Sequence, residues 1–157
     1  MEKLKSIDEV CGLSLGNTHG MNGKNNSRLG VAQMINTLCG GSNYDGWKII
    51  TDENVYHILL DNGQSCCESW GYIVSESDFS EFVGKDIKDV RLTDTKLNNS
   101  SVYSDLDNLY HGGVQFVDFE FSDGGVLQFA VYNGHNGYYG HGIIIAKNED
   151  ILLSDVL

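Results

Sequence analysis

The chain has 157 residues, is 41% hydrophobic and carries a net charge of −12. A chain of this length can bury a core without disulfides or metals, and we expect residues 1–157 to form a single domain. The negative balance excludes direct nucleic-acid binding, which needs a cationic footprint, and no apolar run approaches the about 20 residues of a membrane helix.

The N-terminal third predicts a loop followed by a helix. Residues 12–26 are rich in Gly and Asn and are typical of a loop. Ser27 is suited to cap a helix, and apolar residues recur at three- and four-residue spacing over 28–39. We therefore expect a loop-and-helix element over 1–46, packed on a strand-rich core over 47–157.

Strands dominate the rest of the pattern. Asp61-Asn62-Gly63 is typical of a hairpin turn and leads into the run Cys66-Cys67-Glu68. Val117, Phe119 and Phe121 alternate with Asp118 and Glu120, which predicts a sheet with one apolar and one solvent face. Further strands are expected over residues 47–51, 55–60, 71–74, 86–92, 127–131 and 143–145. The fold class expected is α+β: an antiparallel sheet with one main helix near 28–39 and short helical turns.

The cysteines raise the question of a metal or thiol site. Cys11, Cys39, Cys66 and Cys67 lack the closely spaced pairs typical of zinc sites, and adjacent cysteines are too close for ordinary use by one metal. Buried free thiols are the main expectation, and zinc held by these four cysteines is the minor alternative. A thiol enzyme using His57 is the least favoured reading, and no cofactor is expected.

The segment 133–142 interleaves four glycines with polar and aromatic residues. Asn136, Tyr138 and Tyr139 could hydrogen-bond and stack on a base, while glycine amides approach a phosphate. Lys24 and Arg28 are the cations of the other Gly-rich loop. These five side chains define an alternative site for a nucleotide signal, and a wide hairpin connection is the simpler explanation of the glycines.

Three short motifs occur in a characteristic order: Cys66-Cys67-Glu68-Ser69, then residues 82–87, then Asn136-Gly137-Tyr138-Tyr139. Over roughly residues 50–146 the chain resembles an uncharacterised domain family of phage and bacterial proteins. The resemblance implies a strand-rich fold and a phage or prophage origin. It supplies no catalytic residue, and residues 11–41 depart from its pattern.

The charge distribution guides the functional expectation. Residues 1–50 carry five basic and four acidic groups, and residues 51–157 carry five basic and eighteen acidic groups. We expect a non-enzymatic, cytoplasmic, phage-derived inhibitor that docks an acidic surface on the basic groove of a bacterial defence protein such as a CRISPR nuclease. The acidic residues expected at that interface are Asp86, Asp89, Asp94, Asp105 and Asp107.

Overall fold

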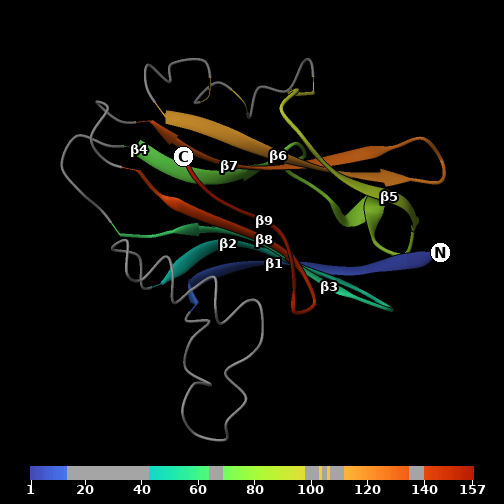
Figure 1. The fold of residues 1–157 in the computed structure, drawn as a ribbon. Coiled ribbons are helices and arrows are strands. Elements are labelled where there is room, and N and C mark those ends of the chain that lie inside the picture. Colours follow the sequence, from blue (N-terminus) through green and yellow to red (C-terminus); the bar gives the residue numbers. More distant parts are fainter. Residues whose placement is uncertain (14–42, 64–68, 98–102, 104–105, 107–111, 135–139) are drawn as a thin grey trace, which may run out of the picture.

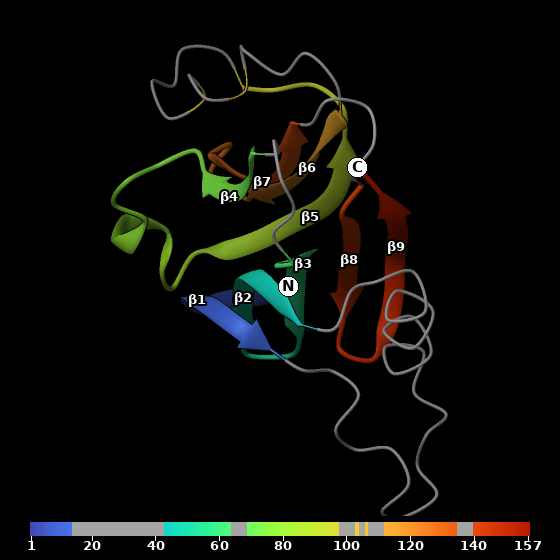
Figure 2. The same ribbon diagram turned by 90° about the vertical axis from the view of Figure 1, so that its left-hand side faces the viewer.

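A computed structural model of the chain describes residues 1–13, 43–63, 69–97, 103, 106, 112–134 and 140–157. Nine strands form one continuous antiparallel sheet in the order β4-β7-β6-β5-β1-β2-β3-β8-β9. The sheet folds over into two layers (Figures 1 and 2). One layer contains β4, β7, β6 and β5, and the other contains β1, β2, β3, β8 and β9. The strands are β1 (Glu2–Leu13), β2 (Tyr44–Thr51), β3 (Val55–Asp61), β4 (Ser69–Val74), β5 (Asp86–Thr93), β6 (Gly112–Phe121), β7 (Val126–Gly134), β8 (Gly142–Lys147) and β9 (Asp150–Val156).

The main core lies between the two layers. β6 and β7 direct Phe119 and Phe129 inward, and their rings meet edge to face with centroids 5.4 Å apart. From the opposite layer, Tyr56 of β3 meets Phe119 in the same way at 5.2 Å. Such edge-to-face pairs add stabilisation to the apolar area that they bury. The alternation of side chains along each strand therefore supplies one contiguous core between the sheets.

The expected α+β class is wrong. The described residues are almost entirely antiparallel strand, and their only regular helical element is the short 3-10 turn η1 (Ser80–Phe82). The expected main helix at 28–39 lies outside the described residues. Within the part of the chain that the structure describes, no helix is long and apolar enough to cross a membrane.

A strand that the sequence did not indicate joins the two layers. β1 lies between β5 and β2 in the sheet order, and it buries Leu4 and Ile7. The two buried residues are three apart because the β1–β2 register shifts between Leu4 and Ser6. That irregularity breaks the period-two pattern by which a strand is recognised in sequence.

The expected hairpin at Asp61-Asn62-Gly63 is not formed. β3 ends at Asp61, but the next strand, β4, pairs with β7 in the other layer. The neighbours of β3 are β2 and β8. The Asp61 carboxylate accepts the Gly63 N–H at 2.8 Å, so the turn residues make a local Asx-type bend without pairing two strands.

Other strand expectations are confirmed, including the β6–β7 hairpin, whose Phe121 N–H donates to the Gly125 carbonyl oxygen at 2.8 Å. The expected solvent face of that hairpin is wrong, because Asp118 is 5% exposed and Gln128 is fully buried. Tyr103, Phe116 and Ala130 form a second apolar cluster on this face. The confirmed strand positions are 47–51, 55–60, 71–74, 86–92, 117–121, 127–131 and 143–145.

Candidate functional site

A pocket opens where the two layers separate. β1 pairs with β5 only through Glu2 with Ile87 and Lys3 with Asp86. Past Ile87, β5 has no paired residue on β1, and its register with β6 shifts between Ile87 and Asp89. The space between β5 and the opposite layer is a cavity of about 270 Å³, which we call the inter-sheet pocket. It is lined by Glu2, Tyr56, Ile87, Lys88, Asp89, Val90, Lys147 and Leu152.

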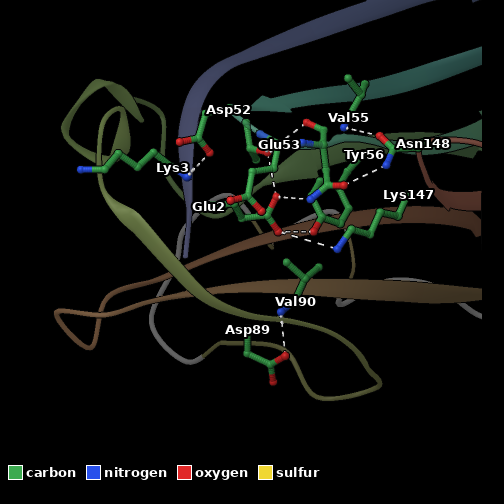
Figure 3. A network of polar contacts seen from close by, with 12 residues as sticks. Glu2, Lys3, Asp52, Glu53, Val55, Tyr56, Asp89, Val90, Lys147 and Asn148 are labelled. Carbon is green, nitrogen blue, oxygen red and sulfur yellow. Dashed lines mark hydrogen bonds and ion pairs between the residues drawn. The ribbon is translucent and has the colours of Figure 1, made fainter.

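Glu2 forms the fixed floor of this pocket. Its side chain is 12% exposed, and one carboxylate oxygen accepts hydrogen bonds from the Thr51 hydroxyl and the Asn54 amide, both at 2.7 Å. The other oxygen accepts the Tyr56 hydroxyl at 2.5 Å (Figure 3). The three donors come from the end of β2, the β2–β3 turn and β3, so Glu2 ties the start of β1 to that hairpin.

The environment fixes the protonation of both partners. Burial pushes the pKa of Glu2 upward, but the three hydrogen bonds and the charge of Lys147 outweigh it, so the pKa lies below its ordinary value. Burial and donation to Glu2 raise the pKa of the Tyr56 hydroxyl. Near neutral pH, Glu2 is therefore an ionised acceptor with its oxygens occupied, and Tyr56 is a protonated donor.

Two lysines, Lys88 and Lys147, line the pocket, and neither makes a short hydrogen bond to an acid among the described residues. The Lys147 ammonium lies 3.9 Å from a Glu2 oxygen and 5.5 Å from the Tyr56 ring centroid, and its side chain is 41% exposed. The first separation is an ion pair longer than the 2.7–2.9 Å typical of a charge-assisted hydrogen bond, and the second is a cation–π contact. Lys88 is exposed, and no acid within the described ranges pairs with it. Asp89 accepts the N–H of its own neighbour Val90 at 2.9 Å.

Two turns beside the pocket place acidic side chains together. Asn148, in the left-handed region at φ 54°, donates from its side chain to the Asn54 side-chain oxygen at 2.8 Å and accepts the Val55 N–H at 2.9 Å. These bonds hold the β8–β9 turn against the β2–β3 turn (Figure 3). The exposed acids of the two turns, which we call the turn-end acidic patch, are Asp52, Glu53, Glu149 and Asp150.

The acidic residues expected at the interface are differently placed. Asp86 lies 3.8 Å from the Lys3 ammonium, and Asp89 and Asp94 are exposed. Along residues 85–96 four basic residues accompany these three acids, so the local net charge is +1. Asp105 and Asp107 lie outside the described residues. β5 therefore presents a surface of mixed charge.

Of the four cysteines, the structure describes only Cys11, which is exposed. Its sulfur lies 3.6 Å from the Tyr72 hydroxyl, which donates to Glu9, and burial with that bond raises the pKa of Tyr72. Over the described ranges, no three His, Cys, Asp or Glu side chains gather as a metal site. Cys39, Cys66 and Cys67 lie outside those ranges, as do all five residues of the nucleotide alternative: Lys24, Arg28, Asn136, Tyr138 and Tyr139.

The described residues that flank two of the sequence motifs do meet. Ser69, which follows Cys66-Cys67-Glu68, pairs with Gly134, which precedes residues 135–139. The buried His141 ring lies 5.5 Å from Trp70, and its Nδ1 lies 2.6 Å from the Asp61 carbonyl oxygen. The described residues that flank the two motifs therefore pair, although Ser69 and Gly134 are 65 positions apart in the sequence.

The pocket residues were missed from sequence because they share no local spacing. Glu2, Tyr56, Lys147 and Leu152 come from four different strands, and the other four lining residues, Ile87 to Val90, are consecutive in a fifth strand, β5. Lys147 gave one indirect signal, because it is among only ten cations in the chain.

Comparison with known proteins places the chain in a family. Residues 21–145 match a family model described as a domain of unknown function, DUF7448. This match begins upstream of residue 50, so it includes most of the segment that the sequence resemblance excluded. The chain is 30% identical over 119 residues to the "Uncharacterized protein L278" of Acanthamoeba polyphaga mimivirus, covering 74% of this chain and 89% of that protein. No solved structure matches. The chain therefore belongs to the DUF7448 family, whose function is unknown, and it is similar to a viral protein.

Proposed function

We propose that this chain is a non-enzymatic, viral-type protein that acts by binding a protein of the infected cell through the turn-end acidic patch. The observation that carries the proposal is the clamp between Asn54 and Asn148, which holds two acidic turns side by side. Four exposed carboxylates on a fixed surface complement a cationic partner and steer its approach. In the adjacent pocket, Glu2 and Tyr56 are committed to each other, which favours binding over proton transfer.

The partner class favoured by the sequence is a defence protein with a basic nucleic-acid groove, such as a CRISPR nuclease. The net charge of −12 supports docking on such a groove. Because basic and acidic side chains alternate along β5, we place the proposed contact at the turn-end acidic patch instead of at Asp86, Asp89 and Asp94. The viral relative comes from a virus named for an amoeba, which adds nucleic-acid-binding proteins of a eukaryotic host to the partners worth testing.

A charge-reversal pair tests the location of the contact. The variant Glu53→Lys/Glu149→Lys reverses two acids of the turn-end acidic patch, and Glu76→Lys/Glu81→Lys makes the same change in net charge near η1. Binding to purified CRISPR nucleases, measured by biolayer interferometry from low to high salt, should weaken with salt and with the first variant only. Equal loss in both variants would refute the turn-end contact, and no binding at low salt would remove this partner class.

The nucleotide alternative remains a prediction, because none of its five residues belongs to the described part of the chain. A thermal-shift screen with cyclic nucleotides separates the two functions. A ligand present at about 100 times its dissociation constant stabilises the folded state by about 2.7 kcal/mol. A stabilisation of that size by one nucleotide would favour the sequestering function over protein binding.

A further inference from the structure

We propose that the inter-sheet pocket binds a small carboxylate that carries an apolar body. This ligand is not the protein partner proposed above, and the inference does not rest on that function. It rests on the composition of one cavity whose lining residues are all described: two lysines, a carboxylate that already accepts three hydrogen bonds, a second carboxylate and three aliphatic side chains.

The first argument concerns hydrogen-bonding capacity. Both Glu2 oxygens already accept donors, and one Asp89 oxygen accepts the Val90 N–H. Lys88 and Lys147 each carry three donors, and neither makes a short hydrogen bond to a described acid. The pocket thus has a surplus of cationic donors and few free acceptors. A ligand that supplies acceptor oxygens satisfies that surplus, whereas a ligand that supplies donors does not.

The second argument concerns charge and shape. The two lysines balance Glu2 and Asp89, so the local sum is zero although the chain as a whole is strongly acidic. Glu53 of the turn-end acidic patch also acts electrostatically on Tyr56 of the lining, and screening at physiological salt weakens that effect. Ile87, Val90 and Leu152 line the same cavity, and Leu152 is 44% exposed. These three side chains can contact an apolar body within a lining that is otherwise mostly polar, and 270 Å³ lies just below the roughly 300–1,000 Å³ of drug-sized pockets.

The test compares two probes of equal length and opposite charge. Isothermal titration calorimetry measures hexanoate and hexylamine binding to the full chain, with inorganic phosphate as an anion that lacks an apolar body. We expect hexanoate to bind at millimolar or tighter concentration, with weaker or absent binding of the other two. Equal binding of hexanoate and hexylamine, or no hexanoate binding at about 10 mM, would overturn the proposal.

Variants locate the site. Lys88→Met/Lys147→Met keeps the aliphatic stems and removes both charges, and Lys5→Met is the control at an exposed lysine outside the pocket lining. The double variant should weaken hexanoate binding about tenfold or more, because charge-assisted bonds are lost, and the control should bind like the parent. If the double variant does not fold, the single Lys88→Met carries the test at an exposed side chain. Unchanged binding in a folded pocket variant would refute the assignment.

Two further probes separate the sources of such a ligand. A blocked dipeptide ending in valine, as the free acid and as the amide, represents the carboxyl terminus of a partner chain, and hexanoate represents a free metabolite. Tighter binding of the free acid than of hexanoate assigns the pocket to a chain terminus, and the reverse order assigns it to a metabolite. The variant Glu53→Lys/Glu149→Lys changes no residue of the pocket lining. Loss of protein binding at the turn-end acidic patch and loss of hexanoate binding in the pocket are therefore measured separately.

Discussion

Gln128 should be one of the most sensitive positions in the molecule. Its side chain is fully buried on the outer face of β7, and all its hydrogen-bonding groups are used. The amide nitrogen donates to Asp118 at 2.7 Å and to the Thr95 carbonyl at 3.0 Å. The amide oxygen accepts from the Tyr103 hydroxyl at 2.6 Å and from the Leu97 N–H at 2.9 Å. One residue thus fixes the chain after β5 against the sheet.

The substitution Gln128→Leu keeps the volume and removes all four bonds. Asp118 keeps its ion pair with Arg91 at 3.7 Å, and Tyr103 keeps its hydrogen bond with Ser75. The Leu97 N–H and the Thr95 carbonyl therefore lose the most, because the variant removes their side-chain partner. Each of the four hydrogen bonds contributes about 0.5–1.5 kcal/mol net, which gives about 2–6 kcal/mol for all four. The greater apolar burial of leucine returns about 1–2 kcal/mol. We therefore expect a loss of about 3 kcal/mol in the free energy of unfolding.

Urea denaturation measures this loss as a shift of the midpoint, about 1–2 M for a chain of this size. Gln115→Leu is the matched control, because its half-buried amide donates only to two carbonyls, at 3.0 and 3.2 Å, and should lose less than about 1 kcal/mol. Amide hydrogen exchange at Leu97 should quicken in the Gln128 variant, since its acceptor is gone. A loss below about 1 kcal/mol with unchanged exchange would refute the reasoning.

Four other substitutions, one of them a control, test separate parts of the structure. Burial raises the pKa of Tyr103 to about 12, so its contribution is present below its ordinary pKa of 10.0 and is lost as the pH rises towards 12. Tyr103→Phe should therefore flatten the fall in stability, measured by denaturation at pH 9 and 11.5. Gly46→Ala places a Cβ 2.0 Å from the Ile58 oxygen at φ +151° and should cost roughly 3 kcal/mol or prevent folding. Gly113→Ala, which meets only a leucine methyl at 3.3 Å, is the control and should cost less than about 1 kcal/mol when both variants are compared with the parent by urea denaturation. The pKa of Glu2 is lowered, so its contribution is present above about pH 4.5 and is lost as the pH falls through the lowered pKa. Glu2→Gln should therefore cost about 1–2 kcal/mol at pH 7, and urea denaturation should show a smaller cost at acidic pH.

The sequence predicted strands where local composition and the fold agree. Ile143-Ile144-Ile145 is β-branched and is buried on both faces in β8. The solvent face expected for β6 and β7 was wrong because Asp118 and Gln128 are polar yet buried, each satisfied by partners more than nine positions away. The alternation of polar and apolar residues along a strand shows which side chains are polar. It does not show that two polar side chains hydrogen-bond to each other beneath another segment of the chain.

The turn at Asp61-Asn62-Gly63 shows a second limit. Its residue types are suited to a tight bend, and a bend is what they make. Whether the strands on either side of the bend then pair depends on the order of the whole sheet. In that order β4 is an edge strand beside β7, whereas β3 lies between β2 and β8. The same non-local order assembles the inter-sheet pocket from β1, β3, β5, β8 and β9, which no sequence spacing could reveal.

Burial of the sheet faces narrows where this fold can meet a partner. Phe116, Ala130 and Tyr103 are buried on the outer face of one layer, and Leu59 and Ile144 are buried on the outer face of the other. A partner therefore cannot contact these side chains unless the segments that bury them are displaced. Exposing each large apolar side chain in this way costs about 1.5–3 kcal/mol. Ends and edges of the sheets remain, and the turn end combines a fixed acidic surface with an open pocket. If binding is found to depend on residues at the centres of these faces, the outer clusters must open on binding, and amide exchange at Ala130 or Ile144 would then rise in the complex.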